Sequence, residues 1–195
     1  MDDFKKIKVV HESTISLLVD NPTELKLIGK GAHGAVFKLS KDKCVKIYAD
    51  THNAEKEAGS YKIGQSSEIV PRLHEVGENY IVMEFIEGIS LWKYLSDKKE
   101  ISFDISKKIV LLLKEMRRLG FTRIDSSLRH IIFTKDEKLK TIDLVYAYVR
   151  NDKKPVKIFT ELKKLGLVKQ FMDHIKVIDI GLFNEWNEAM AEFIK

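Results

Sequence analysis

Apolar and polar residues alternate over several short stretches of the chain, as expected for strands that bury one face. Strands are predicted over 24–30, 35–40, 43–49, 72–78, 79–85, 129–133 and 138–144, the fourth and fifth as a hairpin. Gly-rich or Lys-Asp turns separate the first three strands. This pattern predicts a β-rich first half.

The spacing of apolar residues is helical elsewhere. Helices are predicted over 51–64, over 89–97, over 103–120 and from about 156 onward. The first helix begins at a Thr or Asn cap and ends at Gly64. The apolar residues of the third share one face, as in a helix packed on a core: Ile105, Ile109, Leu112, Leu113 and Met116.

A β-rich half followed by a helical half predicts an α+β fold with a boundary near 86–90. The 195 residues fit one domain, or two small lobes that fold together. With 44% hydrophobic and 32% charged residues, the chain is too apolar to be disordered.

Charge and cysteine content narrow the class of protein. The net charge is +5, but the lysines are scattered among 29 acidic residues, which is typical of solvated helix faces and argues against a nucleic-acid partner. A single cysteine excludes an internal disulfide framework and a Cys-rich zinc site, and fits a reducing compartment. Neither a membrane span of about 20 apolar residues nor a signal-peptide core is visible. We therefore expect a cytoplasmic protein with no membrane partner.

Glycines at three positions form the pattern G-x-G-x-x-G, which Val36 extends to G-x-G-x-x-G-x-V: Gly29, Gly31 and Gly34. Glycine lets backbone amides approach phosphates closely. Dinucleotide-binding folds use the same spacing before a helix, whereas here a β-hairpin pattern follows. This order favours a loop that joins two strands and covers a nucleotide. The alternative is a tight hairpin without function.

The segment after this loop resembles protein kinases. Lys43-Cys44-Val45-Lys46 is similar to their strand motif Val-Ala-Ile-Lys. The resemblance implies that Lys46 contacts the α/β-phosphates of ATP and that Cys44 covers adenine. It also implies a helix glutamate that orients the lysine, which is Glu57 with Glu55 as the poorer choice.

Residues 80–88, YIVMEFIEG, resemble the segment that joins the two kinase lobes. By that resemblance Met83 lies at the back of the adenine pocket, and the backbones of Glu84 and Ile86 bind adenine. Gly88 would let the chain turn into the second lobe. A plain strand end is the alternative.

Two aspartates, Asp125 and Asp143, lie eighteen residues apart, as in the kinase catalytic segment. The resemblance implies that Asp125 orients and deprotonates the attacking hydroxyl, and that Asp143 holds Mg²⁺ or Mn²⁺. His130 occupies the position of a second metal ligand that is Asn in kinases. Arg129 occupies the position of an arginine in tyrosine-kinase catalytic loops, and could supply positive charge.

The chain departs from the kinase pattern in further positions. The His-Arg before Asp125 is Arg123-Ile124, the usual lysine after it is Ser127, and the Phe-Gly after Asp143 is Leu144-Val145. Asp179-Ile180-Gly181 also resembles Asp-Phe-Gly, but no suitable aspartate precedes it, so Asp179 is predicted to belong to a C-terminal helix or its cap. Only 52 residues follow Asp143, without Ala-Pro-Glu, which predicts a reduced second lobe.

The resemblance, over about 24–148, is to a small, divergent, bacterial-type serine/threonine protein kinase. It implies one two-lobed kinase-like domain, with a β-rich N-lobe (1–87) and a truncated, mainly helical C-lobe (88–195). The implied function is phosphoryl transfer from ATP to a protein Ser or Thr. A pseudokinase that acts as a regulatory scaffold and a small-molecule phosphotransferase are the alternatives.

Overall fold

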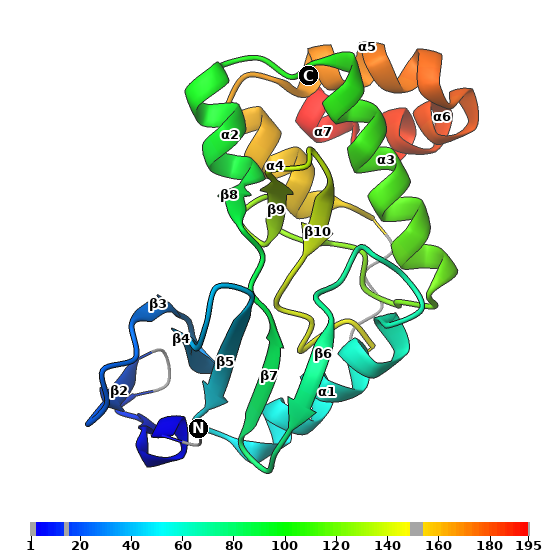
Figure 1. Ribbon diagram of the computed structural model, residues 1–195. Helices are drawn as coiled ribbons and strands as arrows, with labels where there is room; N and C mark the ends of the chain where they lie inside the picture. The colour runs from blue at the N-terminus through cyan, green and yellow to red at the C-terminus, as the bar shows by residue number, and fades with distance from the viewer. Residues whose placement is uncertain (1–2, 14–15, 149–153, 195) are drawn as a thin grey trace. The chain divides into compact units, whose positions relative to one another are not determined.

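A computed structural model describes residues 3–13, 16–148 and 154–194 (Figure 1). The fold is α+β. The chain forms two compact units: Met1–Ile86 with Leu144–Tyr146, and Glu87–Asp143 with Ala147–Lys195. The first unit is therefore completed by Leu144–Tyr146, a segment that is distant in sequence from its main part, whereas the second unit is interrupted by these three residues alone.

The first unit contains a five-stranded antiparallel sheet in the order β3-β4-β5-β7-β6. Its strands are β3 (Leu27–Lys30), β4 (Gly34–Lys38), β5 (Lys43–Tyr48), β6 (Leu73–Val76) and β7 (Tyr80–Glu84). Helix α1 (Thr51–Gly64) contacts β5, β6 and β7. The strands and the helix predicted for this region are confirmed. The predicted Thr or Asn cap is wrong, because the Asp50 carboxylate accepts a hydrogen bond from the amide of His52 and caps the helix.

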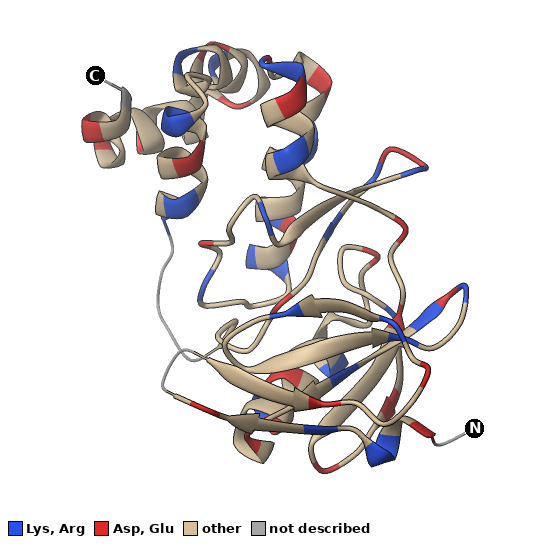
Figure 2. Cartoon of the chain, turned by 90° about the vertical axis from the view of Figure 1, so that its left-hand side faces the viewer, with Lys and Arg blue, Asp and Glu red and all other residues tan. Residues whose placement is uncertain are grey.

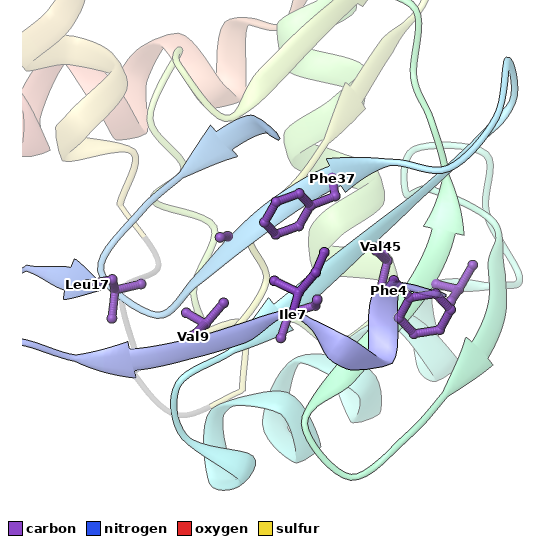
Figure 3. Packing of buried hydrophobic residues seen from close by; sticks show 9 residues of the cluster. Phe4, Ile7, Val9, Leu17, Phe37 and Val45 are labelled. Carbon is purple, nitrogen blue, oxygen red and sulfur yellow. The ribbon is translucent and has the colours of Figure 1, made fainter. Parts of the chain in front are cut away.

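An N-terminal layer covers one face of this sheet (Figure 3). It consists of a 3-10 helix, η1 (Asp3–Lys6), and the hairpin of β1 (Lys8–His11) and β2 (Leu17–Asp20), which the sequence pattern did not predict. The layer and the sheet bury a common apolar cluster: Phe4, Ile7, Val9, Leu17, Ala35, Phe37, Val45, Ile47 and Val82. The second face of the sheet is left for α1 and the residues described below.

The second unit combines a three-stranded antiparallel sheet, in the order β10-β9-β8, with helices. Its strands are β8 (Gly88–Ser90), β9 (Ile131–Thr134) and β10 (Leu139–Thr141). Its helices are α2 (Leu91–Lys98), α3 (Phe103–Arg118), α4 (Val156–Lys164), α5 (Val168–Ile178), α6 (Ile180–Ala189) and α7 (Ala191–Ile194). Strand β8 was not predicted. All five apolar residues assigned to one face of α3 are at most 2% exposed, which confirms that prediction.

Asp179 separates α5 from α6 and caps the second of these helices, which confirms its prediction as a helix cap. Its carboxylate accepts a hydrogen bond from the amide of Leu182 and lies 2.6 Å from Lys114 Nζ. The ammonium of Lys114, followed by the Leu182 amide, lowers the pKa of Asp179. This residue therefore serves helix capping.

Basic and acidic residues are interspersed along both units (Figure 2). Several of the lysines and arginines on α3 have acidic partners, such as Arg117 with Glu185 and Arg118 with Glu115. Within the described part of the chain, no helix combines the length and the apolar character needed to cross a membrane.

Candidate functional site

Four residues predicted to surround a nucleotide lie on one face of the first sheet. Lys46 on β5 is directly opposite Val36 on β4, and Cys44 on β5 is directly opposite Met83 on β7. Directly opposed residues of antiparallel strands project from the same face, and so do residues two apart on one strand. Val45, between Cys44 and Lys46, belongs to the cluster beneath the N-terminal layer. The four residues therefore share the opposite face.

A buried carboxylate, that of Glu57 on α1, organises this face. Lys46 Nζ lies 2.6 Å from its Oε2, and the Tyr48 hydroxyl donates to the same oxygen over 2.8 Å. The amide of Leu144 donates to its Oε1 over 3.1 Å. The ion pair expected from the kinase resemblance is therefore present. Its role toward a nucleotide stays a prediction.

The environment explains why Glu57, and not Glu55, takes this place. Glu57 is completely buried, whereas the side chain of Glu55 is 84% exposed and lies near His52. A buried carboxylate is costly unless charged and polar donors compensate it. Glu57 has three such donors, one of which, Leu144, directly follows Asp143 in the chain. The polar cluster thus fixes the backbone next to the candidate metal ligand.

The glycines of the G-x-G-x-x-G pattern differ in what requires them. A Cβ at Gly34 would lie 2.4 Å from the carbonyl oxygen of Ile47, so the close approach of β4 to β5 demands glycine there. A Cβ at Gly31 would meet no atom within 4 Å, and one at Gly29 would make ordinary contact with Val36. The fold itself therefore explains Gly34 and leaves Gly29 and Gly31 unexplained.

The backbone at the end of β7 is largely engaged in hydrogen bonds. The amides of Glu84 and Phe85 donate to the carbonyls of Arg72 and Asp42, both over 2.8 Å. Over residues 3–13, 16–148 and 154–194, the amide of Ile86 has no hydrogen-bond partner. The backbones of both Glu84 and Ile86 were predicted to bind adenine. The amide of Glu84 is engaged by Arg72, and this role stays a prediction for both residues.

Gly88 has a different role from the predicted one. It begins strand β8, and a Cβ there would lie 2.3 Å from the carbonyl oxygen of Phe133 on β9. Close strand pairing, and not a turn in the chain, therefore requires this glycine.

The second unit holds the predicted catalytic aspartate, Asp125, in the segment before β9. Its Oδ1 accepts a hydrogen bond of 2.5 Å from the amide of Lys157, in the first turn of α4. The neighbouring Ser126 hydroxyl lies 3.4 Å from the hydroxyl of Thr141 on β10. Ile124, at the position of the kinase arginine, is buried. The segment is thus attached to both α4 and the sheet.

The hairpin of β9 and β10 brings together the two predicted metal ligands. The amide of Ile142 donates to the carbonyl of His130 over 2.8 Å, which extends the strand pairing beyond Ile131. His130 Nδ1 consequently lies 3.5 Å from Asp143 Oδ2, with both side chains partly exposed. Asp143 has φ +62°, a left-handed conformation that is uncommon outside glycine but is adopted by aspartate more readily than by most residues. No cluster of three or more His, Cys, Asp or Glu side chains suited to a metal occurs among the described residues.

Arg129 extends from the same segment and is exposed. Its guanidinium lies over the ring of Trp92 on α2, 4.8 Å from the ring centroid, which is a cation–π contact. The amide of Trp92 also donates to the carbonyl of Leu128 over 3.0 Å. Helix α2 therefore orients Arg129, a contact that the sequence did not reveal.

The two glycines provide a matched stability test. Gly34→Ala should lower the free energy of unfolding by about 1–3 kcal/mol, because its Cβ would overlap a backbone carbonyl. Gly31→Ala should change it by less than about 0.5 kcal/mol, because its Cβ meets open space. Urea denaturation of both variants measures the difference. Equal destabilisation would contradict the packing reason given for Gly34.

Cys44 should be almost unreactive in the folded chain. Burial, followed by the charge of Glu84, raises the pKa of its thiol from 9.0 to about 12. Since the thiolate is the nucleophile and forms only as the pH approaches this pKa, its fraction at pH 8 falls about 1000-fold. We expect iodoacetamide at pH 8 to alkylate Cys44 at least about 100-fold more slowly in the folded chain than in the urea-unfolded chain, because so little of the folded thiol is ionised. Similar rates in mass spectrometry would show that the thiol is accessible and ionised.

No protein-family model matches the chain. The chain is 31% identical over 126 residues to a Bacillus subtilis protein named "Putative serine/threonine-protein kinase YrzF", a stretch that covers 62% of this chain and 59% of that protein. It is 32% identical over 84 residues to an uncharacterised protein of Dictyostelium discoideum, covering 43% of this chain and 9% of that protein. The chain thus spans less than two thirds of the length of both relatives. The first likeness indicates a distant kinase-like relationship.

Proposed function

We propose that this chain is a minimal, two-lobed kinase-like enzyme that transfers the terminal phosphoryl group of ATP to a protein Ser or Thr hydroxyl. The observation that carries the proposal is the completely buried carboxylate of Glu57. It forms an ion pair with Lys46 and also accepts a hydrogen bond from the amide of Leu144, the residue after Asp143. Buried ion pairs are weak contributors to stability compared with apolar packing. A lysine held in this way on the glycine-loop face is better explained as a phosphate ligand. The name of the Bacillus relative supports the same class of reaction.

ATP would bind to the face of the first sheet that carries Lys46. Val36, Cys44 and Met83 offer an apolar surface for adenine, and the amide of Ile86 offers a hydrogen-bond donor. The open space at Gly31 allows phosphate oxygens to approach the backbone amides of the loop. Lys46 would then neutralise part of the phosphate charge.

The second unit would supply the chemistry. Asp125 accepts the proton of the acceptor hydroxyl, whose oxygen attacks the terminal phosphorus while the bond to the leaving ADP oxygen breaks. Asp143 and His130 would hold a divalent cation, which neutralises phosphate charge when bound. Their donor set fits Mn²⁺ better than Mg²⁺, because Mg²⁺ prefers oxygen ligands and imidazole suits softer metals.

A regulatory scaffold is the second candidate, and the pairing of His130 with Asp143 favours it. An imidazole in place of an amide oxygen weakens the magnesium site that catalysis needs. In this function the nucleotide face would bind ATP weakly or not at all.

Nucleotide binding is tested by the ATP-dependent shift in melting temperature of Lys46→Met against Lys43→Met. Lys43 is an exposed lysine of the same strand. Bound ATP at about 100 times its dissociation constant stabilises the folded state by about 2.7 kcal/mol. We expect this shift in the wild type and in Lys43→Met, and none in Lys46→Met. Each shift is referred to the same variant without ATP, because Lys46→Met also removes a donor from Glu57. A full shift in Lys46→Met would exclude Lys46 as the phosphate ligand.

Transfer of radiolabelled phosphate to a generic basic protein tests the reaction. Asp125→Asn keeps an oxygen acceptor for the Lys157 amide, so the variant should fold. Its transfer rate should fall by about 10²–10⁴, because it lacks the general base.

The choice of metal tests the roles of Asp143 and His130. We expect transfer by the wild type to be faster with Mn²⁺ than with Mg²⁺, and we expect His130→Asn to raise the rate with Mg²⁺. Sugar and amino-alcohol acceptors in parallel test the small-molecule alternative. Absence of transfer by every variant, metal and acceptor would favour the scaffold.

A further inference from the structure

Helix α4 contacts the segment that contains Asp125 at two points. The amide of Lys157 donates to Asp125 Oδ1 over 2.5 Å. Four residues later, Glu161 Oε1 accepts from the Ser127 hydroxyl over 2.8 Å, and its Oε2 accepts from the amide of Leu128 over 2.6 Å. Both oxygens of one carboxylate thus engage the residues that follow Asp125.

The two contacts form a reciprocal arrangement. Pro155 precedes α4 and contributes no side-chain cap, so the first turn of the helix lacks the usual acceptor from its own cap residue. Asp125 supplies an acceptor to this turn at Lys157. Residues 157 and 161 are four apart and lie on the same helix face, so Glu161 reaches the same segment one turn further along.

Burial makes the Glu161 contacts specific. Leu128 is completely buried and Ser127 is 8% exposed, so neither donor has free access to water. Donors that are removed from water are costly to leave without an acceptor, and a carboxylate is a stronger acceptor than a neutral group. These contacts also explain one departure from the kinase pattern, because the Ser127 hydroxyl, at the usual lysine position, is bonded to Glu161.

We propose that Glu161 is a positioning residue for Asp125. By fixing Ser127 and Leu128, it holds the backbone that carries the Asp125 carboxylate toward the acceptor hydroxyl, in a helix for which the kinase resemblance assigns no role. The inference rests on the proposed phosphoryl transfer. Glu161 itself contacts neither nucleotide nor acceptor in this mechanism.

The experiment uses the full chain with Glu161→Gln, Glu161→Asp, Ser127→Ala and the control Glu185→Gln. Glu185 is also a helix glutamate of the second unit, paired with Arg117 at the surface. Glutamine keeps one acceptor oxygen but presents an NH₂ group to the second donor. The first readout is amide hydrogen exchange at Leu128 by NMR, which does not depend on activity. We expect at least a tenfold increase in Glu161→Gln and no change in Glu185→Gln.

The second readout is phosphoryl transfer, separated into kcat and KM for ATP. We expect Glu161→Gln to lower kcat about tenfold or more while KM for ATP changes less than twofold, since the nucleotide groups lie elsewhere. Ser127→Ala should lower kcat less, because the Leu128 bond persists, and Glu161→Asp should recover part of the loss. A purely structural role would lower the amount of folded enzyme and leave kcat per folded molecule unchanged.

The outcomes separate this inference from the proposed function. Unchanged exchange at Leu128, or raised exchange with normal kcat, overturns the positioning role while the kinase proposal stands. If the wild type transfers phosphate to no acceptor, the proposed function fails and the positioning role fails with it. Raised exchange in that case identifies a structural contact alone.

Discussion

The carboxylate of Glu57 is the constraint on which the first unit depends. It lies in the interior with no exposure to water, and its charge is compensated by the Lys46 ammonium, the Tyr48 hydroxyl and the Leu144 amide. Removal of one partner of a buried charged pair typically costs about 3–5 kcal/mol, far more than a surface pair. The strand, the helix and the segment after Asp143 are therefore held in one arrangement by one side chain.

The second unit uses a related device in a more exposed setting. Asp125 accepts a hydrogen bond from the first turn of α4, which has no side-chain cap of its own. Glu161 of the same helix accepts from Ser127 and Leu128, which follow Asp125 in the chain. In both units a carboxylate connects a helix to a segment distant in sequence. Phosphoryl transfer demands little covalent chemistry from the protein and much positioning, so such connections are suited to it.

The sequence predicted those features that depend on local spacing. Period-two alternation located β5, and the 51–64 pattern located α1, so the Lys46–Glu57 pair could be inferred from two elements and a family resemblance. The hairpin of β1 and β2 was missed because its strands read KVVH and LLVD, in which the apolar residues are adjacent and do not alternate with polar ones. The sequence pattern attributed Gly88 to a turn in the chain. The carbonyl that requires glycine there belongs to Phe133, more than forty residues later, so local pattern could not indicate it.

Two sets of contacts could not be inferred from local pattern. The Leu144 amide lies 87 residues from Glu57, and the two donors to Glu161 lie 33 and 34 residues from it. Glu161 itself, in a helix of mixed charge, has the sequence surroundings of an ordinary surface residue. Only the folded arrangement distinguishes it from its charged neighbours.

The discontinuity of the first unit has a consequence for how the molecule can be divided. Leu144–Tyr146 belongs to this unit although the main part ends at Ile86. A fragment that stopped at Ile86 would retain every strand of the five-stranded sheet, yet its Glu57 would lack the amide of Leu144. During synthesis the same donor is absent until residue 144 has emerged, so the polar interior of the first unit is completed only after β10 has been made. A cut at Ile86 would therefore separate Glu57 from one of its three donors.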